Sequence, residues 1–309
     1  MPQTGAAGDK IFRLILLSAA TILLLIIVGI LLMMVQNALP SIERFGLGFL
    51  TGREWKAAQN EFGALPFIYG TIVSSIIAVV LAVPLSLGIA IFLVEQASPK
   101  IARPISFLIE LLAAIPSVVY GLWAIFVLAP FVRNHLGVFL QNYFGWLPIF
   151  QGRLTGIGMF TAGLVMDLMI LPIVTAVVRD VLETVPQAQR EAALALGATQ
   201  WETTRVVLGN AASGIAGAIV LGLGRAIGET MAVTMVIGNS PRISASLFEP
   251  ANTIASLLAA NFAEATDEIY LSALIEMGLV LFLVTFIVNA LAKLLIIGVT
   301  NRANNTRRA

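Results

Sequence analysis

Six long apolar runs divide the chain, with more polar connections between them. The runs cover about residues 11–35, 67–94, 104–130, 155–178, 213–238 and 271–299. A helix needs about 20 apolar residues to cross the hydrocarbon core of a bilayer, so each run is long enough to span it. The pattern therefore predicts an all-α polytopic membrane protein with six transmembrane helices.

The first run is too long for the apolar region of a signal peptide, which is usually about 7–15 residues. We therefore expect it to be an uncleaved membrane anchor. Pro84, Pro116 and Pro172 lie inside the second, third and fourth runs. Membrane helices tolerate proline where neighbouring groups satisfy the freed carbonyl, so we expect kinks at these positions.

The composition agrees with a membrane protein and excludes several other classes. Hydrophobic residues make up 59% of the 309 residues and charged residues 11%, whereas soluble domains carry about 25% charge. The net charge of +1 leaves no basic face for nucleic acid. Cysteine is absent and His135 is the one histidine, so thiolate sites, histidine triads and multi-histidine metal sites are excluded. We expect no cofactor.

The lysines and arginines of the connections predict the orientation in the membrane. One side of the predicted membrane has ten of them and the other has six, and the richer side normally faces the cytoplasm. This places both termini in the cytoplasm, with tails at residues 1–10 and 300–309 around a permease domain at 11–299. The ten are Lys10, Arg13, Lys100, Arg103, Arg179, Arg190, Arg205, Arg302, Arg307 and Arg308.

The cytoplasmic connection at residues 185–212 is typical of two short helices. Pro186 suits the first position of a helix and Gly197 suits the position just past its end. The segment "TQWE", Thr199–Glu202, has the capping-box spacing that starts a second helix. Its alanines and leucines are too apolar to be left in water. The hairpin could lie on the membrane surface, or it could insert a short helix into a groove on a cytoplasmic partner.

Within this hairpin, "EAALALG" at Glu191–Gly197 resembles the EAA loop of ABC importer permeases. The resemblance implies a coupling helix that docks into an ATPase subunit, with coupling residues at Arg190, Glu191, Ala192, Ala193 and Gly197. One position departs from the pattern. Related permeases often have proline at the end of the second helix, and this chain has glycine there, in "VVLG".

The resemblance extends across most of the chain. The segments "AAIPSVVYGLWAIFVLAP", "MILPIVTAVVRD" and "GRAIGETMAVTMVIGN" are similar to inner-membrane permeases of the phosphate-specific transport system, and the third is similar to the PstC type. This implies a bacterial inner-membrane complex for phosphate: a heterodimer with a PstA-type permease, two copies of a cytoplasmic ATPase and an external phosphate-binding protein. Because this chain has no GxxxxGK[ST] loop, ATP hydrolysis is expected on the separate ATPase.

Two charges stand inside the fifth apolar run, four residues apart. A charge at the centre of a membrane helix costs roughly 2.5–3.5 kcal/mol. At about 6 Å, Arg225 and Glu229 would attract each other by about 3 kcal/mol at an effective dielectric of 20. The pair could be purely structural, or Arg225 could offer its donors to an anion on a pathway while Glu229 holds it in place. The family resemblance supports a role in translocation; the residues alone do not separate phosphate from sulfate.

Two further features of the apolar runs are candidates. Asp167 is a lone carboxylate in the fourth run, which could pair with Arg225, stay protonated or take part in transport. Gly224 and Gly228 have the GxxxG spacing that favours close contact between membrane helices. "GLGRAIG" lacks the spacing of a dinucleotide loop and follows no strand.

Two rival functions remain at this stage. An importer of sulfate or molybdate would have the same architecture. A secondary transporter driven by a proton gradient could use Asp167 or Glu229 as its relay. A membrane-embedded enzyme is disfavoured, because the chain has a single histidine, no cysteine and no cluster of carboxylates.

Overall fold

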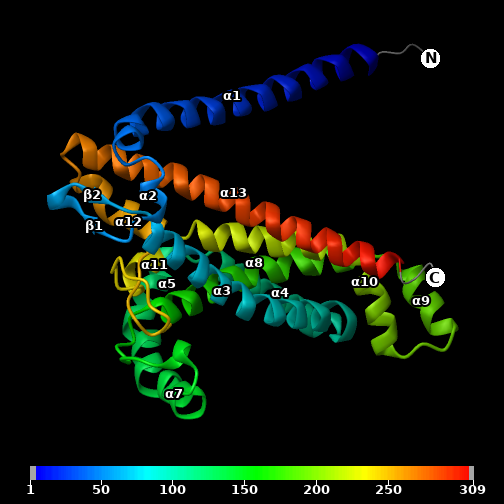
Figure 1. Cartoon of the computed structure of the whole chain (residues 1–309). Coiled ribbons are helices and arrows are strands. Elements are labelled where there is room, and N and C mark those ends of the chain that lie inside the picture. Colours follow the sequence, from blue (N-terminus) through cyan, green and yellow to red (C-terminus); the bar gives the residue numbers. More distant parts are fainter. Residues whose placement is uncertain (1–4, 306–309) are drawn as a thin grey trace.

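The computed structural model (Figure 1) describes the backbone of residues 5–305 and the side chains of residues 8–294. The outer parts of the two predicted tails, residues 1–4 and 306–309, lie outside this range. The elements that form the membrane bundle are α1 (Gly5–Phe45), α3 (Leu65–Ile91), η2 (Phe92–Gln96), α4 (Pro99–Ala113), α5 (Ser117–Trp123), η3 (Ala124–Leu128), α6 (Ala129–Phe131), η4 (Val132–Leu136), α7 (Gly137–Phe144), α8 (Met159–Glu183), α10 (Gln200–Ile227), α11 (Met231–Val236) and α13 (Glu268–Asn305).

Shorter elements close the two ends of the bundle. At one end lie α2 (Gly48–Thr51), a hairpin of β1 (Trp55–Lys56) and β2 (Glu61–Phe62) with the 3₁₀ turn η1 (Ala57–Gln59) between its strands, η5 (Pro148–Phe150), α12 (Ile254–Asn261) and η6 (Phe262–Glu264). The other end carries α9 (Gln187–Ala195). In Figure 1 the first turn of α1 and the last turns of α13 lie toward the same end as α9.

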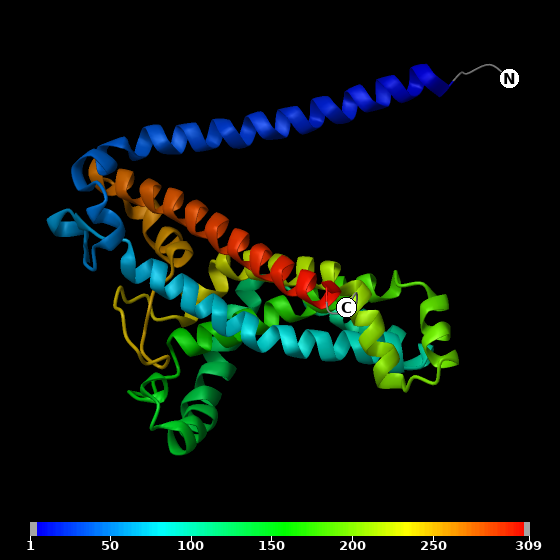
Figure 2. The same ribbon diagram turned by 45° about the vertical axis from the view of Figure 1, so that its right-hand side comes forward.

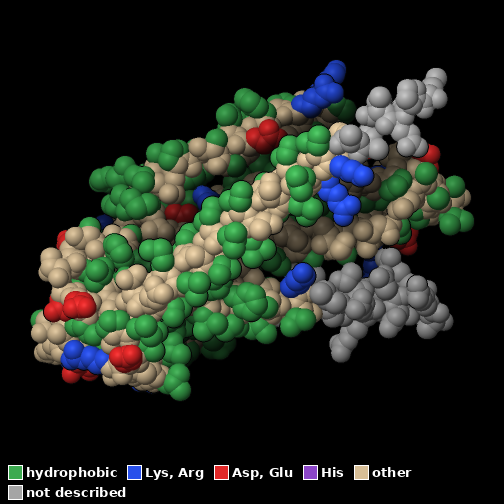
Figure 3. All heavy atoms as spheres, turned by 90° about the horizontal axis from the view of Figure 1, so that it is seen from above, with side chains coloured by type: hydrophobic (Ala, Val, Ile, Leu, Met, Phe, Trp, Pro, Cys, Tyr) green, Lys and Arg blue, Asp and Glu red, His purple; other side chains and the backbone are tan. Residues whose placement is uncertain are grey.

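The six-span fold is confirmed. Six helical segments are long and apolar enough to cross a membrane: Gly8–Phe45, Leu65–Gln96, Ser117–Phe144, Met159–Glu183, Gln200–Ile227 and Glu268–Leu294. Charged side chains are sparse along the middle of the face in Figure 3, where hydrophobic side chains and backbone dominate. Such a surface is suited to lipid or to other membrane subunits rather than to water.

The third span differs from its predicted range of 104–130. An amphipathic helix, α4, ends at Ala113, and the spanning segment begins at Ser117 and continues through the π-helical turns η3 and η4 to Phe144. Pro116 causes the break, because it has no N–H to donate to the carbonyl of Leu112. The hydroxyl of Tyr120 donates to that carbonyl instead, at 3.0 Å. Pro84 and Pro172 lie inside uninterrupted helices.

The fifth span differs from its predicted range more than the third span does. The prediction placed it at 213–238 after a short second hairpin helix, but α10 is one helix that begins in the hairpin at Gln200 and ends at Ile227. Where related permeases have proline, Gly209 keeps its backbone N–H, so the helical ladder is not interrupted. The hairpin therefore has one short helix, α9, and one long one.

The predicted GxxxG contact between helices is formed at Gly224, where an added Cβ would lie 3.7 Å from Asn289 of α13, but not at Gly228. Gly228 is the C-cap of α10, and a Cβ built on it would approach only the backbone of its own chain segment, at Gly224 and Arg225. Two glycines earlier in α10 lie against α8: a Cβ on Gly222 would lie 2.7 Å from Val174, and a Cβ on Gly214 would lie 2.5 Å from Val181. Because neither glycine has a side chain, α10 and α8 can approach closely.

The first span packs differently from the other five. Figures 1 and 2 show α1 meeting the bundle near its C-terminal end and diverging from it toward its N-terminus. The side chains of Ile22, Leu24 and Leu25 are accordingly exposed within this chain. At the end that α1 contacts, Trp55 packs on Phe62 with ring centroids 4.9 Å apart, and Phe62 stacks on Tyr270. This aromatic cluster joins the β-hairpin to the first turn of α13.

Candidate functional site

The two charges of the fifth apolar run lie at a helix break, not at the middle of a helix. Arg225 is in the last turn of α10, and Glu229 lies between the end of α10 and the start of α11. The freed carbonyl of Gly228 accepts a hydrogen bond from the hydroxyl of Thr230, at 3.1 Å. Irregular backbone within a membrane bundle is tolerated where it is buried in protein or lines a water-filled cavity.

Arg225 and Glu229 form an ion pair in which the two partners have different surroundings. The distance from Nη2 of Arg225 to Oε2 of Glu229 is 3.9 Å; the arginine side chain is 44% exposed and the glutamate 7%. Oε1 of Glu229 also accepts the backbone N–H of Ala232, at 3.4 Å. The carboxylate is therefore fixed between two helix ends, while the guanidinium projects outward. Among the side chains of residues 8–294, this ion pair is the only polar contact of Arg225.

Asp167 is buried close to the same level of the bundle. Gly222 of α10 lies against Val174 of α8, and the two helices run in opposite directions. Glu229 follows Gly222 by as many residues as Asp167 precedes Val174, so Glu229 and Asp167 lie near the same level. Asp167 is 6% exposed and its Oδ1 has no hydrogen-bond partner. It takes part in no ion pair among residues 8–294, so the pairing with Arg225 that the sequence suggested is not formed.

A polar residue that sequence reasoning missed lies beside the arginine turn. A Cβ built on Gly224 would lie 3.7 Å from Nδ2 of Asn289, which belongs to α13. Oδ1 of Asn289 is buried without a hydrogen-bond partner in the described structure. The sequence does indicate Asn289 as a candidate site residue, because it is a lone amide within the apolar stretch "VTFIVNALAKLL".

The hairpin of α9 and the start of α10 has the local geometry that its sequence predicted. Gly197 follows α9 with φ +83°, a conformation that glycine adopts without steric cost. The capping box of Thr199 and Glu202 starts α10. Leu194, Leu196 and Trp201 are all exposed, and Leu196 is 90% exposed. The hairpin thus presents apolar side chains at the end of the molecule.

The five predicted coupling residues fall into two groups. Glu191, Ala192 and Gly197 are exposed and Ala193 is half-buried, so they belong to the hairpin surface. Arg190 is turned inward, with Nη2 2.8 Å from Oε1 of Glu95. Sequence reasoning missed Glu95, since 95 residues separate the two partners.

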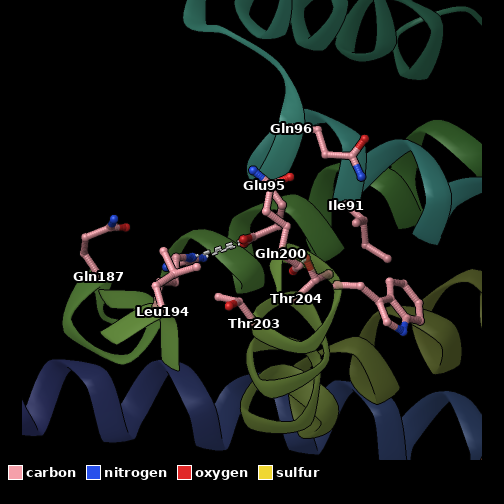
Figure 4. Close-up of a pocket in the computed structure, with 10 residues that line it drawn as sticks. Ile91, Glu95, Gln96, Gln187, Leu194, Gln200, Thr203 and Thr204 are labelled. Atoms are coloured by element: carbon pink, nitrogen blue, oxygen red, sulfur yellow. Dashed lines mark hydrogen bonds and ion pairs between the residues drawn. The ribbon is translucent and has the colours of Figure 1, made fainter. Parts of the chain in front are cut away.

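A pocket of about 460 Å³ lies behind the hairpin, between α9, the start of α10 and η2. Figure 4 shows Gln187 and Leu194 on one side, Glu95 and Gln96 on another, the ion pair as dashed lines between them, and Thr203 and Thr204 below. The buried ion pair therefore lies beside an open space rather than inside a packed core.

Comparison with known proteins assigns this arrangement to a family. Residues 82–300 match the model of the binding-protein-dependent transport system inner membrane component. Phosphate transport system permease proteins named PstC are 42% identical in Mesorhizobium japonicum (96% of this chain, 92% of the relative) and 44% in Xylella fastidiosa strain 9a5c (97% and 94%). The one from Haemophilus influenzae is 46% identical over 86% of both chains.

A solved structure supports the fold. The MetNI methionine ABC transporter in an inward facing conformation matches with a TM-score of 0.51 and 18% identity, over 75% of this chain and 93% of that chain. The membrane bundle, the hairpin and the sequence relatives lead to one assignment. This chain belongs to the binding-protein-dependent transport inner-membrane family and, within it, to the PstC group of phosphate transport system permeases.

Proposed function

We propose that this chain forms half of the membrane pathway of an ATP-driven phosphate importer, in a heterodimer with a PstA-type permease. The relatives that share 42–46% of its residues are named as phosphate transport permeases. Six spanning segments are enough for one half of such a pathway. The single observation that carries the proposal is the partly exposed guanidinium of Arg225 at the break between α10 and α11.

Arg225 would give phosphate a transient positive partner partway along the pathway. A guanidinium stays protonated, and its donors match the geometry of phosphate oxygens. Glu229 is nearly buried and fixed by its own hydrogen bond, so it holds the arginine in place and lowers its net field. A conducting site must bind weakly enough to release its ion, and the paired carboxylate meets this requirement.

Asp167 is the third proposed member of the pathway. Its register places it near the level of Glu229, on the neighbouring helix α8, with an oxygen that no described group satisfies. Polar groups buried within a membrane bundle usually face its interior or a water-filled path. A carboxylate at this position would oppose prolonged retention of an anion at Arg225.

The hairpin would couple this pathway to ATP hydrolysis on a separate chain. Leu196 and the neighbouring exposed apolar residues suit insertion of a short helix into a groove on a partner. The partner would be a cytoplasmic ATPase, present in two copies to serve two permeases, and an external phosphate-binding protein would deliver the substrate. Both termini would then lie in the cytoplasm, on the side of α9, in the inner membrane of a bacterium.

Uptake of labelled phosphate tests this proposal. Cells that lack the gene would receive the original chain, Arg225→Gln, or Arg242→Gln as a matched control at an exposed arginine in the connection after α11. We expect the original chain and the control to restore uptake, and Arg225→Gln to reach the membrane with its ATPase but to transport at least tenfold more slowly. Normal transport by Arg225→Gln would make the ion pair structural.

Competition identifies the substrate class in the same assay. Unlabelled sulfate and molybdate should leave phosphate uptake unchanged, whereas unlabelled phosphate should compete. If the original chain fails to restore phosphate uptake with its partners present, phosphate is the wrong substrate. Uptake that follows the proton gradient rather than ATP would instead identify a secondary transporter.

A further inference from the structure

Arg190 ties together three elements at the cytoplasmic end of the bundle. It belongs to α9, its Nη2 lies 2.8 Å from Oε1 of Glu95 in η2, and its Nη1 donates to the carbonyl of Val185 at 2.6 Å. Nη2 also donates to the carbonyl of Leu182, at 3.0 Å. Both carbonyls lie at the C-terminus of α8, where helical carbonyls lack partners and a positive charge is favoured.

This ion pair is more enclosed than the other ion pairs among residues 8–294. The side chains of Arg190 and Glu95 are 14% and 9% exposed. Arg179 also joins two helices through Glu110, but that glutamate is 55% exposed. A largely enclosed pair gives little net stability compared with apolar packing, yet removing one partner leaves the other charge without compensation in a partly desolvated position. The geometry of the Arg190–Glu95 pair is therefore strongly held.

Among residues 8–294, the Arg190–Glu95 pair is the only polar contact between the coupling helix and η2 of the second span. The pocket of about 460 Å³ separates α9 from η2, and it is lined by both partners of the ion pair (Figure 4). Since this space separates the two elements, the charged pair is the direct contact through which displacement of α9 reaches η2, beside the apolar packing that joins α10 to the second span. The carbonyl contacts of Arg190 carry the same displacement to the end of α8.

We propose that Arg190 and Glu95 form a mechanical link that passes movement of the coupling helix to the second and fourth spans. The inference rests on the proposed function, in which α9 docks into an ATPase, and it assigns Arg190 a role within this subunit rather than at the ATPase surface. Both are positioning residues. Their loss should separate ATP hydrolysis from transport while leaving the docking surface on Glu191 and Leu196 in place.

The test uses the whole complex in proteoliposomes, with the second permease, the ATPase and the binding protein. Phosphate imported per ATP hydrolysed is measured for Arg190→Gln, Glu95→Gln, the exchange Glu95→Arg/Arg190→Glu and the control Arg179→Gln. We expect the ratio to fall at least tenfold in both single variants, with ATPase still bound and hydrolysis retained, and to stay unchanged in the control. The exchange restores the ion pair but not the contacts with the carbonyls of Val185 and Leu182, so it should recover only part of the ratio.

A purely structural role has a different signature and would overturn the inference. Hydrolysis and import would then fall in parallel, the ratio would stay near that of the original complex, and less ATPase would co-purify. Failure of the proposed function is distinguishable, because the unmodified complex itself would then import no phosphate.

The absence of cysteine from the chain permits a second test that does not depend on the charges. Glu95→Cys/Arg190→Cys, with cysteine-free partner subunits, is bridged by a short bis-methanethiosulfonate that reductant cleaves. We expect the phosphate imported per ATP hydrolysed to be low before bridging, to rise on bridging and to fall again on reduction. If bridging did not change this ratio, no link would be needed between these positions.

Discussion

The hydroxyl of Ser41 donates a hydrogen bond of 2.5 Å to Oε2 of Glu276, and so joins the first and last spans. Both residues are buried, Ser41 fully and Glu276 at 7% exposure. The backbone N–H of Ser41 also donates to the hydroxyl of Ser272, at 3.0 Å. These hydrogen bonds lie near the C-terminal end of α1, where α1 meets the bundle. Toward its N-terminus, α1 diverges from the bundle (Figures 1 and 2).

Replacing Ser41 by alanine should therefore loosen the first span. The variant removes one partner of a buried carboxyl group, which costs about 1–3 kcal/mol when the group stays unsatisfied. Thermal unfolding of the purified chain in detergent measures the effect. Ser18→Ala, which removes a hydroxyl bonded only within its own exposed helix, is the control and should change stability little.

Alanine substitutions at two glycines of α10 should have opposite effects on stability. Gly222→Ala would place a Cβ 2.7 Å from Val174, and overpacking of this kind costs typically about 1–3 kcal/mol. Gly217→Ala meets no atom within 4 Å, and alanine in a helix is favoured over glycine by roughly 0.5–1 kcal/mol. The melting temperature should therefore fall in Gly222→Ala and rise slightly in Gly217→Ala. Equal shifts would mean that α10 and α8 are not in close contact at Gly222.

The exposed tip of the hairpin should matter for the ATPase but not for the fold. Leu196→Ser removes a side chain that is 90% exposed, so stability should change by no more than about 0.5 kcal/mol. We expect the amount of co-purified ATPase to fall severalfold. Leu47→Ser is the matched control, since Leu47 is 83% exposed in the connection that follows α1. Equal ATPase recovery in both variants would contradict docking at Leu196.

Glu229→Gln should make the anion site at Arg225 too strong. Without its charged partner, the guanidinium should hold phosphate about tenfold more tightly, a change of about 1.4 kcal/mol, and uptake at saturating phosphate should slow. Phosphate binding to the nucleotide-free complex and uptake by proteoliposomes measure the two effects. Glu264→Gln, an exposed acid in the 3₁₀ turn after α12, serves as control. Unchanged affinity and rate would mean that the pair only stabilises the helix break.

Local signals in the sequence were reliable where a feature depends on neighbouring residues. Apolar runs of spanning length yielded the correct number of membrane helices. The capping box at Thr199 and Glu202 and the left-handed glycine at Gly197 were located correctly, because each is set by a few consecutive residues. The inner-membrane family could likewise be recognised from short motifs.

Helix breaks and distant contacts could not be predicted in the same way. Residues on both sides of Pro116 are apolar, so α4 and α5 looked like one run, and the break at Gly228–Thr230 contains no proline. The pairing of Arg190 with Glu95 depends on how α9 folds back against η2, which no local pattern encodes. For the same reason, Asn289 could not be placed beside Gly224 from the sequence.

The continuity of α10 gives the molecule a long lever arm. Its 28 residues begin in the hairpin and end at the turn that carries Arg225, with no proline between them. At about 1.5 Å per residue, the arginine lies roughly 38 Å along the axis from Gln200. A tilt of about 10° at the hairpin would then move the far end sideways by roughly 7 Å. A small rotation at the proposed ATPase-binding end would thus become a displacement at the arginine that is comparable to the size of a phosphate ion.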